Sequence, residues 1–218
     1  MEMSFIESAR NAERFFEIDQ GESFLLTEGE GLVMISAPHS VTQTRGGVLK
    51  RAEPQTGALA LLLHEKLNCP IICKTSNKGD DANFDMTSDY KDALAAHIRK
   101  NGIKFLIDLH QLSSERDVAI DVGTGRSKNL NDGRILDLIL RVFSDKALGR
   151  VAVDHPFSGA TDRTVSSFVR SSCNIDCVQI EINSGLVYGE GCGKTYEKVF
   201  RALEKTVTDI NAYLGGKK

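Results

Sequence analysis

The stretch Phe105-Leu-Ile-Asp-Leu-His-Gln111 decides the expected fold, because it combines a strand pattern with two ionisable side chains. An apolar run of this kind is typical of a strand that is buried on both faces of a sheet. Side chains alternate along a strand, so Asp108 and His110 point to the same side near its carboxyl end. Ligands of open α/β sheets bind at that edge. We expect this pair to be a metal ligand with its supporting group or half of an acid/base pair, and a buried His held by Asp gives the same pattern.

The rest of the chain alternates strand-like and helix-like segments at the spacing of β–α units. Two short strands, 23–27 and 32–36, flank glycines 29 and 31, and this pattern predicts a β-hairpin. The basic segment 44–51 is expected to be a loop. Further strands are expected at 70–74, 103–109, 117–122, 150–153 and 177–182, and helices at 8–16, 53–66, 88–101, 132–143 and 195–214. The sequence therefore predicts an α/β fold in which residues 1–218 form a single domain, with a mixed sheet flanked by helices.

Composition and charge restrict the partners of the chain. Its 218 residues are enough to bury a sizeable core, and a net charge of −3 gives no reason to expect nucleic acid or an anionic membrane. No apolar run approaches the roughly 18 residues of a membrane span. Residues 1–8 lack a basic region followed by an apolar block, so we expect no signal peptide. Five cysteines, an odd count, indicate reduced thiols and a cytoplasmic protein. The oligomeric state stays open.

Polar residues follow two other predicted strands. His39 comes just after the strand 32–36, which Pro38 ends because proline cannot donate to a ladder. Glu181 lies inside the apolar run 177–182, where a carboxylate is costly to bury unless it is paired or functional. Two histidines and one carboxylate are the ligand set of a catalytic zinc site, and a further carboxylate can act there as general base.

The order of short motifs in the chain resembles the N-formylglutamate amidohydrolase family. The motifs are Ala37-Pro-His-Ser40, Asp108-Leu-His110 and Gln179-Ile-Glu-Ile-Asn183, supported by Asp81-Ala-Asn-Phe-Asp85 and by His155-Pro-Phe-Ser-Gly159 with Arg163 downstream. The resemblance implies a zinc-carboxypeptidase-like (phosphorylase/hydrolase-like) fold. It also implies a metal-dependent amidohydrolase that cleaves the amide C–N bond of a small acidic N-acyl amino acid such as N-formylglutamate.

The same resemblance assigns the catalytic roles. His39 and His110 would be ligands of Zn²⁺ or another divalent metal, Asp108 would orient a ligand, and Glu181 would activate the metal-bound water. The third ligand departs from the family pattern, which is His-x-x-Glu, because Thr42 stands three residues after His39. Glu53 would be the equivalent ligand if the segment between were an insertion. As the residue before a helix that begins with proline, Glu53 also suits a helix cap.

Substrate binding is assigned by the resemblance as well. Arg163 would hold a substrate carboxylate, which a guanidinium binds with two hydrogen bonds, and Arg45 or Arg126 could do the same. His155 and Asn183 are the other candidate substrate-binding residues. Two different functions stay open: a ligand-binding protein on the same fold without metal catalysis, and a metal-free enzyme in which Asp108 and His110 form an acid/base pair.

Overall fold

The computed structural model describes residues 4–216. Residues 1–3, part of the stretch expected to carry no signal peptide, and residues 217–218 lie outside this part. The elements in chain order are α1 (Phe5–Glu17), β1 (Phe24–Thr27), β2 (Val33–Ala37), β3 (Gln43–Arg45), β4 (Val48–Lys50), α2 (Pro54–Leu67), β5 (Ile71–Lys74), α3 (Asp89–Asn101), β6 (Phe105–Leu112), β7 (Ile120–Gly123), α4 (Gly133–Asp145), β8 (Val151–Val153), α5 (Val165–Cys173), β9 (Asp176–Asn183), η1 (Ser184–Leu186) and α6 (Gly193–Gly215). Within residues 4–216, no helix is long and apolar enough to cross a membrane.

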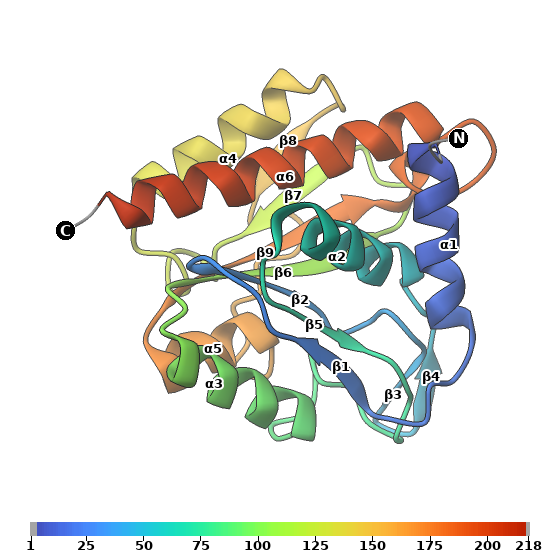
Figure 1. Ribbon diagram of the computed structural model, residues 1–218, viewed down its shortest axis with the longest axis vertical. Coiled ribbons are helices and arrows are strands. Elements are labelled where there is room, and N and C mark those ends of the chain that lie inside the picture. Colours follow the sequence, from blue (N-terminus) through green and yellow to red (C-terminus); the bar gives the residue numbers. More distant parts are fainter. Residues whose placement is uncertain (1–3, 217–218) are drawn as a thin grey trace.

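A seven-stranded mixed sheet forms the centre of the fold, in the order β1-β5-β2-β6-β9-β7-β8. The four central strands, β5, β2, β6 and β9, run parallel to one another, whereas β1 and β7 pair antiparallel with β5 and β9. Helices cover both faces (Figure 1). The prediction of an α/β fold with a mixed sheet flanked by helices is confirmed.

Alternation along β6 divides the core into two layers. Phe105, Ile107 and Leu109 belong to the larger cluster, which packs against α1, α2, α4 and α6. Leu106 belongs to the smaller cluster, which packs against α3 and α5. Because side chains alternate along a strand, Asp108 and His110 point to the same side as Leu106. The polar pair therefore lies on the α3/α5 face, at the carboxyl end of the central strand.

The predicted hairpin of residues 23–36 is wrong, because β5 lies between β1 and β2 in the sheet. All five residues of β2 are buried, so this strand needs a neighbour on each side, and these neighbours are β5 and β6. Gly29 and Gly31 do not form a hairpin turn. They lie where other segments of the chain approach the backbone closely. A Cβ on Gly29 would lie 2.3 Å from the carbonyl oxygen of Asn68, and one on Gly31 would lie 3.0 Å from the Asn211 side chain.

Three other elements differ from the sequence pattern. The basic segment 44–51 forms most of a small antiparallel hairpin, β3–β4, instead of an irregular loop. Helix α5 occupies residues to which the pattern assigned no element, and Thr164 caps it by accepting from Ser167 N. Strand β6 extends to Leu112, three residues beyond the predicted end, because it pairs with β9 along its whole length.

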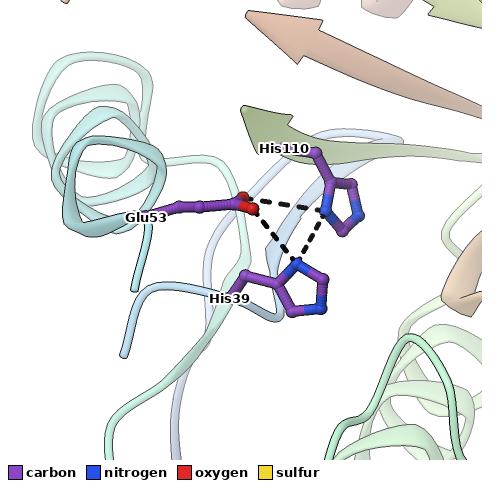
Figure 2. Close-up of side chains that lie close together, drawn as sticks. All are labelled: His39, Glu53 and His110. Carbon is purple, nitrogen blue, oxygen red and sulfur yellow. Dashed lines mark hydrogen bonds and ion pairs between the residues drawn. The ribbon is translucent and has the colours of Figure 1, made fainter. Parts of the chain in front are cut away.

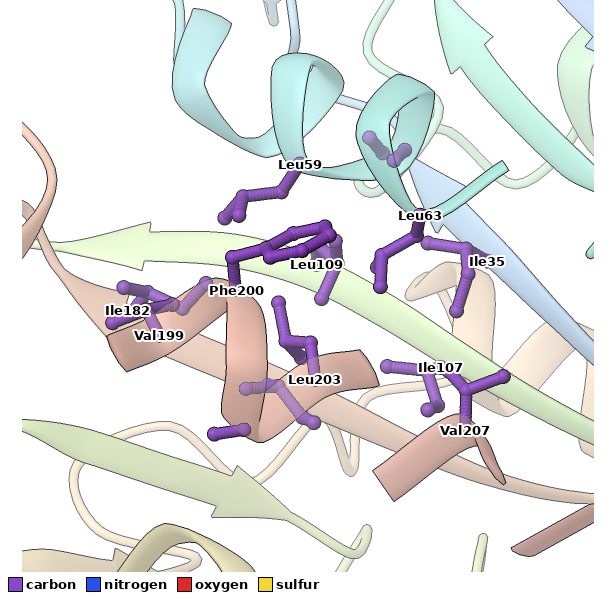
Figure 3. Packing of buried hydrophobic residues seen from close by; sticks show 14 of the residues in the cluster. Ile35, Leu59, Leu63, Ile107, Leu109, Ile182, Val199, Phe200, Leu203 and Val207 are labelled. Atoms are coloured by element: carbon purple, nitrogen blue, oxygen red, sulfur yellow. The ribbon is translucent and has the colours of Figure 1, made fainter. Parts of the chain in front are cut away.

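Helix α2 carries one of the candidate ligands at its beginning and is held by the larger core. Pro54 occupies its first turn, and it ends at Asn68, which is in the left-handed region with its N–H bonded to His64 O. Leu63 is fully buried in this helix and lies close to Ile35 of the sheet (Figure 3).

We expect Leu63→Ala to lower the free energy of unfolding by about 2–5 kcal/mol, because the substitution leaves a cavity between α2 and the sheet. Leu49→Ala is the matched control, since Leu49 is 66% exposed on β4, and it should change the free energy by less than about 0.5 kcal/mol. Urea unfolding followed by circular dichroism measures both. Equal effects of the two substitutions would contradict this packing.

Candidate metal centre

Two backbone features hold His39 at the edge of the sheet. It follows the end of β2 at Ala37, and its carbonyl oxygen accepts a hydrogen bond from the backbone N–H of Glu53 at 2.8 Å. Its side chain is buried, with 5% of the residue exposed. Residues 40–52, which include the β3–β4 hairpin, therefore form a segment outside the seven-stranded sheet whose two ends meet where Glu53 bonds to His39.

Glu53 directs its carboxylate toward the two histidines. It stands at the N-cap position of α2, but its side chain makes no capping hydrogen bond. Oε1 lies 3.4 Å from His39 Nδ1, and Oε2 lies 3.8 Å from His110 Nδ1 and accepts the N–H of Gln111 at 3.0 Å. The alternative reading, in which Glu53 caps the helix through its side chain, is therefore wrong.

His39, Glu53 and His110 form a compact set of donor atoms (Figure 2). The two Nδ1 atoms lie 3.2 Å apart, and one donor atom from each residue fits within 4.8 Å of the others. Two nitrogen ligands of a tetrahedral zinc are separated by about 3.3 Å, given Zn–N bonds of about 2.0–2.1 Å. The histidine spacing and the donor types fit a divalent metal.

Each histidine is oriented by a buried carboxylate on its other nitrogen. Asp81 Oδ1 lies 3.0 Å from His39 Nε2, and Asp108 Oδ2 lies 3.0 Å from His110 Nε2. Ionised carboxylates only accept hydrogen bonds, so each Nε2 donates, and in a neutral imidazole the Nδ1 atom then keeps its lone pair. Two lone pairs that face each other at 3.2 Å need a proton or a cation between them. Carboxylates that fix the tautomer in this way are the usual support of histidine metal ligands.

Asp81 is the functional residue that the sequence reasoning did not assign. In the sequence it is only the first residue of the supporting motif 81–85. Its side chain is fully buried between His39 and Arg45, whose Nε donates to Asp81 Oδ2 at 2.8 Å. No local signal separates this Asp from its neighbours Asp80 and Asp85, since its role depends on two residues far away in the sequence.

Negative charge dominates the surroundings of the two imidazoles. Burial lowers the pKa of His39, but Glu53 and Asp81 outweigh it and raise the pKa to about 10. For His110, burial also lowers the pKa, and Asp108 outweighs burial so that the pKa is raised. Burial raises the pKa of Asp81, but the positive charges of His39 and Arg45 outweigh burial and hold this pKa below its ordinary value. The cluster therefore stabilises positive charge at its centre, as a cation site requires.

Glu181 lies next to His110 because the two residues are partners in the β6–β9 register. Only 4% of Glu181 is exposed, and burial, reinforced by the nearby Glu53, raises its pKa to about 7. The side-chain amide of Gln179 donates to its Oε1. A carboxylate whose pKa lies near neutrality, beside a metal site, suits proton transfer to and from a bound water.

The donor set and Glu181 line one cavity of about 740 Å³. Arg45 and Arg163 line the same cavity, and their guanidinium carbons lie 5.2 and 4.9 Å from the centre of the Phe84 ring. Two arginines over one aromatic ring therefore place positively charged groups in the wall of a cavity that Glu53, Asp162 and Glu181 also line.

The structure does not bring the other predicted substrate-binding residues into this cavity. Arg126 and His155 are exposed and are absent from its lining. From this part of the chain, residues 156–164, which come just after His155, line the cavity instead. The buried amide of Asn183 donates to the carbonyl oxygens of Arg116 and Val118, so its contacts anchor a loop.

Comparison with known proteins places the fold among hydrolases of known structure. No protein-family model matches the sequence, and no curated protein matches it significantly. Three solved structures share the fold. N-formylglutamate amidohydrolase from Ralstonia eutropha JMP134 gives a TM-score of 0.59 at 15% identity and covers 88% of this chain and 98% of its own. A bacteriophage poly-gamma-glutamate hydrolase gives 0.58 at 13% identity, with coverage of 95% and 97%. A metallo-carboxypeptidase from Burkholderia cenocepacia gives 0.54 at 11% identity, with coverage of 87% and 61%.

We expect the purified protein to bind about one divalent metal ion per chain. His110→Ala should lose this ion, because it removes one donor of three, and Asp81→Asn should weaken binding by about 10- to 100-fold, because the tautomer of His39 is no longer fixed. Zinc titration with a competing chromophoric chelator measures both effects.

His155→Ala is the matched control for the metal titration, since His155 is exposed and lies outside the donor set. It should bind metal as the wild type does. Stoichiometric binding that survives in a folded His110→Ala protein would contradict the assignment of the donor set.

Proposed function

We propose that this chain is a metal-dependent amidohydrolase that uses zinc to cleave the C–N bond of a small acidic N-acyl amino acid, N-formylglutamate being the simplest example. The observation that supports this function best is the donor set His39, Glu53 and His110 beside the buried Glu181, in a cavity that also holds two arginines. Among the solved structures that share the fold are two proteins named as hydrolases of glutamate amides.

The metal would polarise the amide carbonyl and lower the pKa of a bound water toward about 7. Glu181 would take a proton from the attacking water as the water oxygen bonds to the carbonyl carbon. As the C–N bond breaks, Glu181 passes the proton to the leaving nitrogen, so that a carboxylic acid and an amine are formed. The histidines and Glu53 hold their donor atoms in place, and Asp81 and Asp108 keep the imidazoles in the required tautomer.

Arg163 gives the site its preference for an acidic substrate. Its guanidinium lies over Phe84 at the edge of the cavity, and its backbone carbonyl accepts a hydrogen bond from Lys91 Nζ at 2.6 Å. Arg45 is less free to bind substrate, because its Nε already donates to Asp81. We therefore assign the substrate carboxylate to Arg163 and a supporting charge to Arg45.

Two features favour this function over the alternatives. Without the His-x-x-Glu spacing the chain could lack a third metal ligand and serve only to bind a ligand, but Glu53 reaches His39 across the segment 40–52. In a metal-free acid/base enzyme, Nδ1 of His110 would be the reactive nitrogen, yet this atom faces His39 and Glu53. The free cysteines fit a reducing compartment, and we keep the cytoplasm as the proposed location.

We expect Glu181→Gln to lower kcat by about 100- to 10,000-fold, because the amide cannot accept the proton of the water. The amide has nearly the same shape as the carboxylate, so the metal content should stay at the wild-type value. Turnover of N-acyl glutamates and zinc content measured on the same preparation test this pair of outcomes. An unchanged kcat would remove Glu181 as the general base.

Arg163→Ala should raise KM for an N-acyl glutamate by about 10- to 100-fold, because a charge-assisted hydrogen bond to the substrate carboxylate is lost. The KM for the corresponding neutral N-acyl glutaminamide, in which both carboxylates are converted to amides, should change much less. Arg126→Ala is the matched control and should behave as the wild type, since Arg126 lies outside the cavity. Equal effects of Arg163→Ala on both substrates would remove its role in charge recognition.

A further inference from the structure

A second cavity adjoins the metal centre. It has a volume of about 700 Å³, close to the 740 Å³ of the first, and the two cavities share Glu53 and Gln111 among their lining residues. The second cavity is lined by the start of α2, the segment that follows β6, and residues at η1. Glu53 of the donor set thus lies where two spaces of similar size meet, and the residues assigned to the proposed reaction line only the first of them.

The second cavity offers a site for an anion. Arg51 and Tyr188 line it, and the guanidinium carbon of Arg51 lies 5.6 Å from the centre of the Tyr188 ring. Among the described residues that line this cavity, Arg51 is the only basic one and Glu53 the only acidic one, and Glu53 directs its carboxylate toward the two histidines. No carboxylate of the described residues forms an ion pair with Arg51.

Other polar groups of the second cavity can complete the recognition of an anion. Ser113, Ser114 and Ser184 line it with hydroxyl groups, which can donate hydrogen bonds to a carboxylate. Tyr188 is 56% exposed, an unusual exposure for a large aromatic side chain, and Arg51 is held against its ring. A stacked guanidinium is already oriented, so less conformational entropy is lost when it binds an oxygen pair.

The geometry of an amide explains why a second cavity matters. An amide that reacts at the donor set has one arm on its nitrogen and another on its carbonyl carbon, and the two arms point in opposite directions. In the proposed function the amino-acid arm lies in the first cavity, where Arg163 holds its carboxylate. A formyl group carries only hydrogen on the carbonyl carbon and would leave the second cavity empty.

Resting on the proposed function, we propose that the second cavity is the subsite for the acyl arm of the substrate. This arm is several carbons long and ends in a carboxylate that Arg51 binds, while Tyr188 packs along the carbon chain. The substrate class is then an N-acyl amino acid whose acyl group derives from a dicarboxylic acid, and formyl derivatives are poorer substrates.

The test compares four N-acyl glutamates that differ only in the acyl arm: formyl, butanoyl, succinyl and glutaryl. Butanoyl has the chain length of succinyl without the charge. For the wild type we expect kcat/KM to be about 10- to 100-fold higher with the best dicarboxylic arm than with butanoyl. Arg51→Ala should remove this preference and leave kcat/KM for the formyl and butanoyl compounds nearly unchanged.

The matched control is Arg134→Ala, which removes another arginine stacked on a tyrosine. The guanidinium carbon of Arg134 lies 5.1 Å from the centre of the Tyr213 ring, outside both cavities. This variant should keep the preference of the wild type. The proposal is overturned if butanoyl is as good a substrate as the dicarboxylic compounds, or if Arg51→Ala lowers kcat/KM equally for all four.

Binding of the same four compounds, measured by calorimetry, separates this proposal from the proposed function. If none is hydrolysed, the proposed function fails, but tighter binding of the dicarboxylic compounds that Arg51→Ala abolishes would still support the subsite. If none is hydrolysed and all four bind equally or not at all, both proposals are overturned.

Discussion

The parallel pairing of β6 with β9 is the constraint on which the site depends. Its register sets His110 beside Glu181 and Asp108 beside Gln179, in the middle of a seven-stranded sheet. The backbone hydrogen bonds of two neighbouring strands allow no slip of one residue without turning every side chain to the other face. These ionisable groups therefore cannot turn toward water, and the remainder of the site has to compensate their charges.

That compensation explains why the cluster contains so many partners. An unpaired charge costs several kcal/mol to bury, so each buried carboxylate has to find a cation or several donors. Asp81 is satisfied by His39 and Arg45, whereas Asp108 pairs with His110 through Oδ2 and its buried Oδ1 has no hydrogen-bond partner among the described residues. Glu53 and Glu181 complete an arrangement that is rich in negative charge, which a divalent ion at the centre would balance. In this view metal binding and the local stability of the fold are coupled.

The segment 40–52 unites the separate parts of the site. It folds into the β3–β4 hairpin and returns Glu53 to His39 through a backbone hydrogen bond. Arg45 lies on one of its strands and reaches the first cavity, and Arg51 follows the other strand and lines the second. One segment of the chain therefore leads to the proposed ligand Glu53 and supplies one arginine to each of the two cavities.

The sequence by itself determined the α/β class, most helices, and the strand ends that carry His39, His110 and Glu181. These features follow from local periodicity, from Pro38 and Pro54, and from ionisable residues inside apolar runs, all of which act over a few residues. Only the tertiary structure decided that β5 separates β1 from β2, that Asp81 supports His39, and that Arg126 stays outside. Strand order and side-chain contacts depend on which surfaces bury one another. These surfaces belong to segments that are far apart in the chain, so no short pattern in the sequence encodes the strand order or the side-chain contacts.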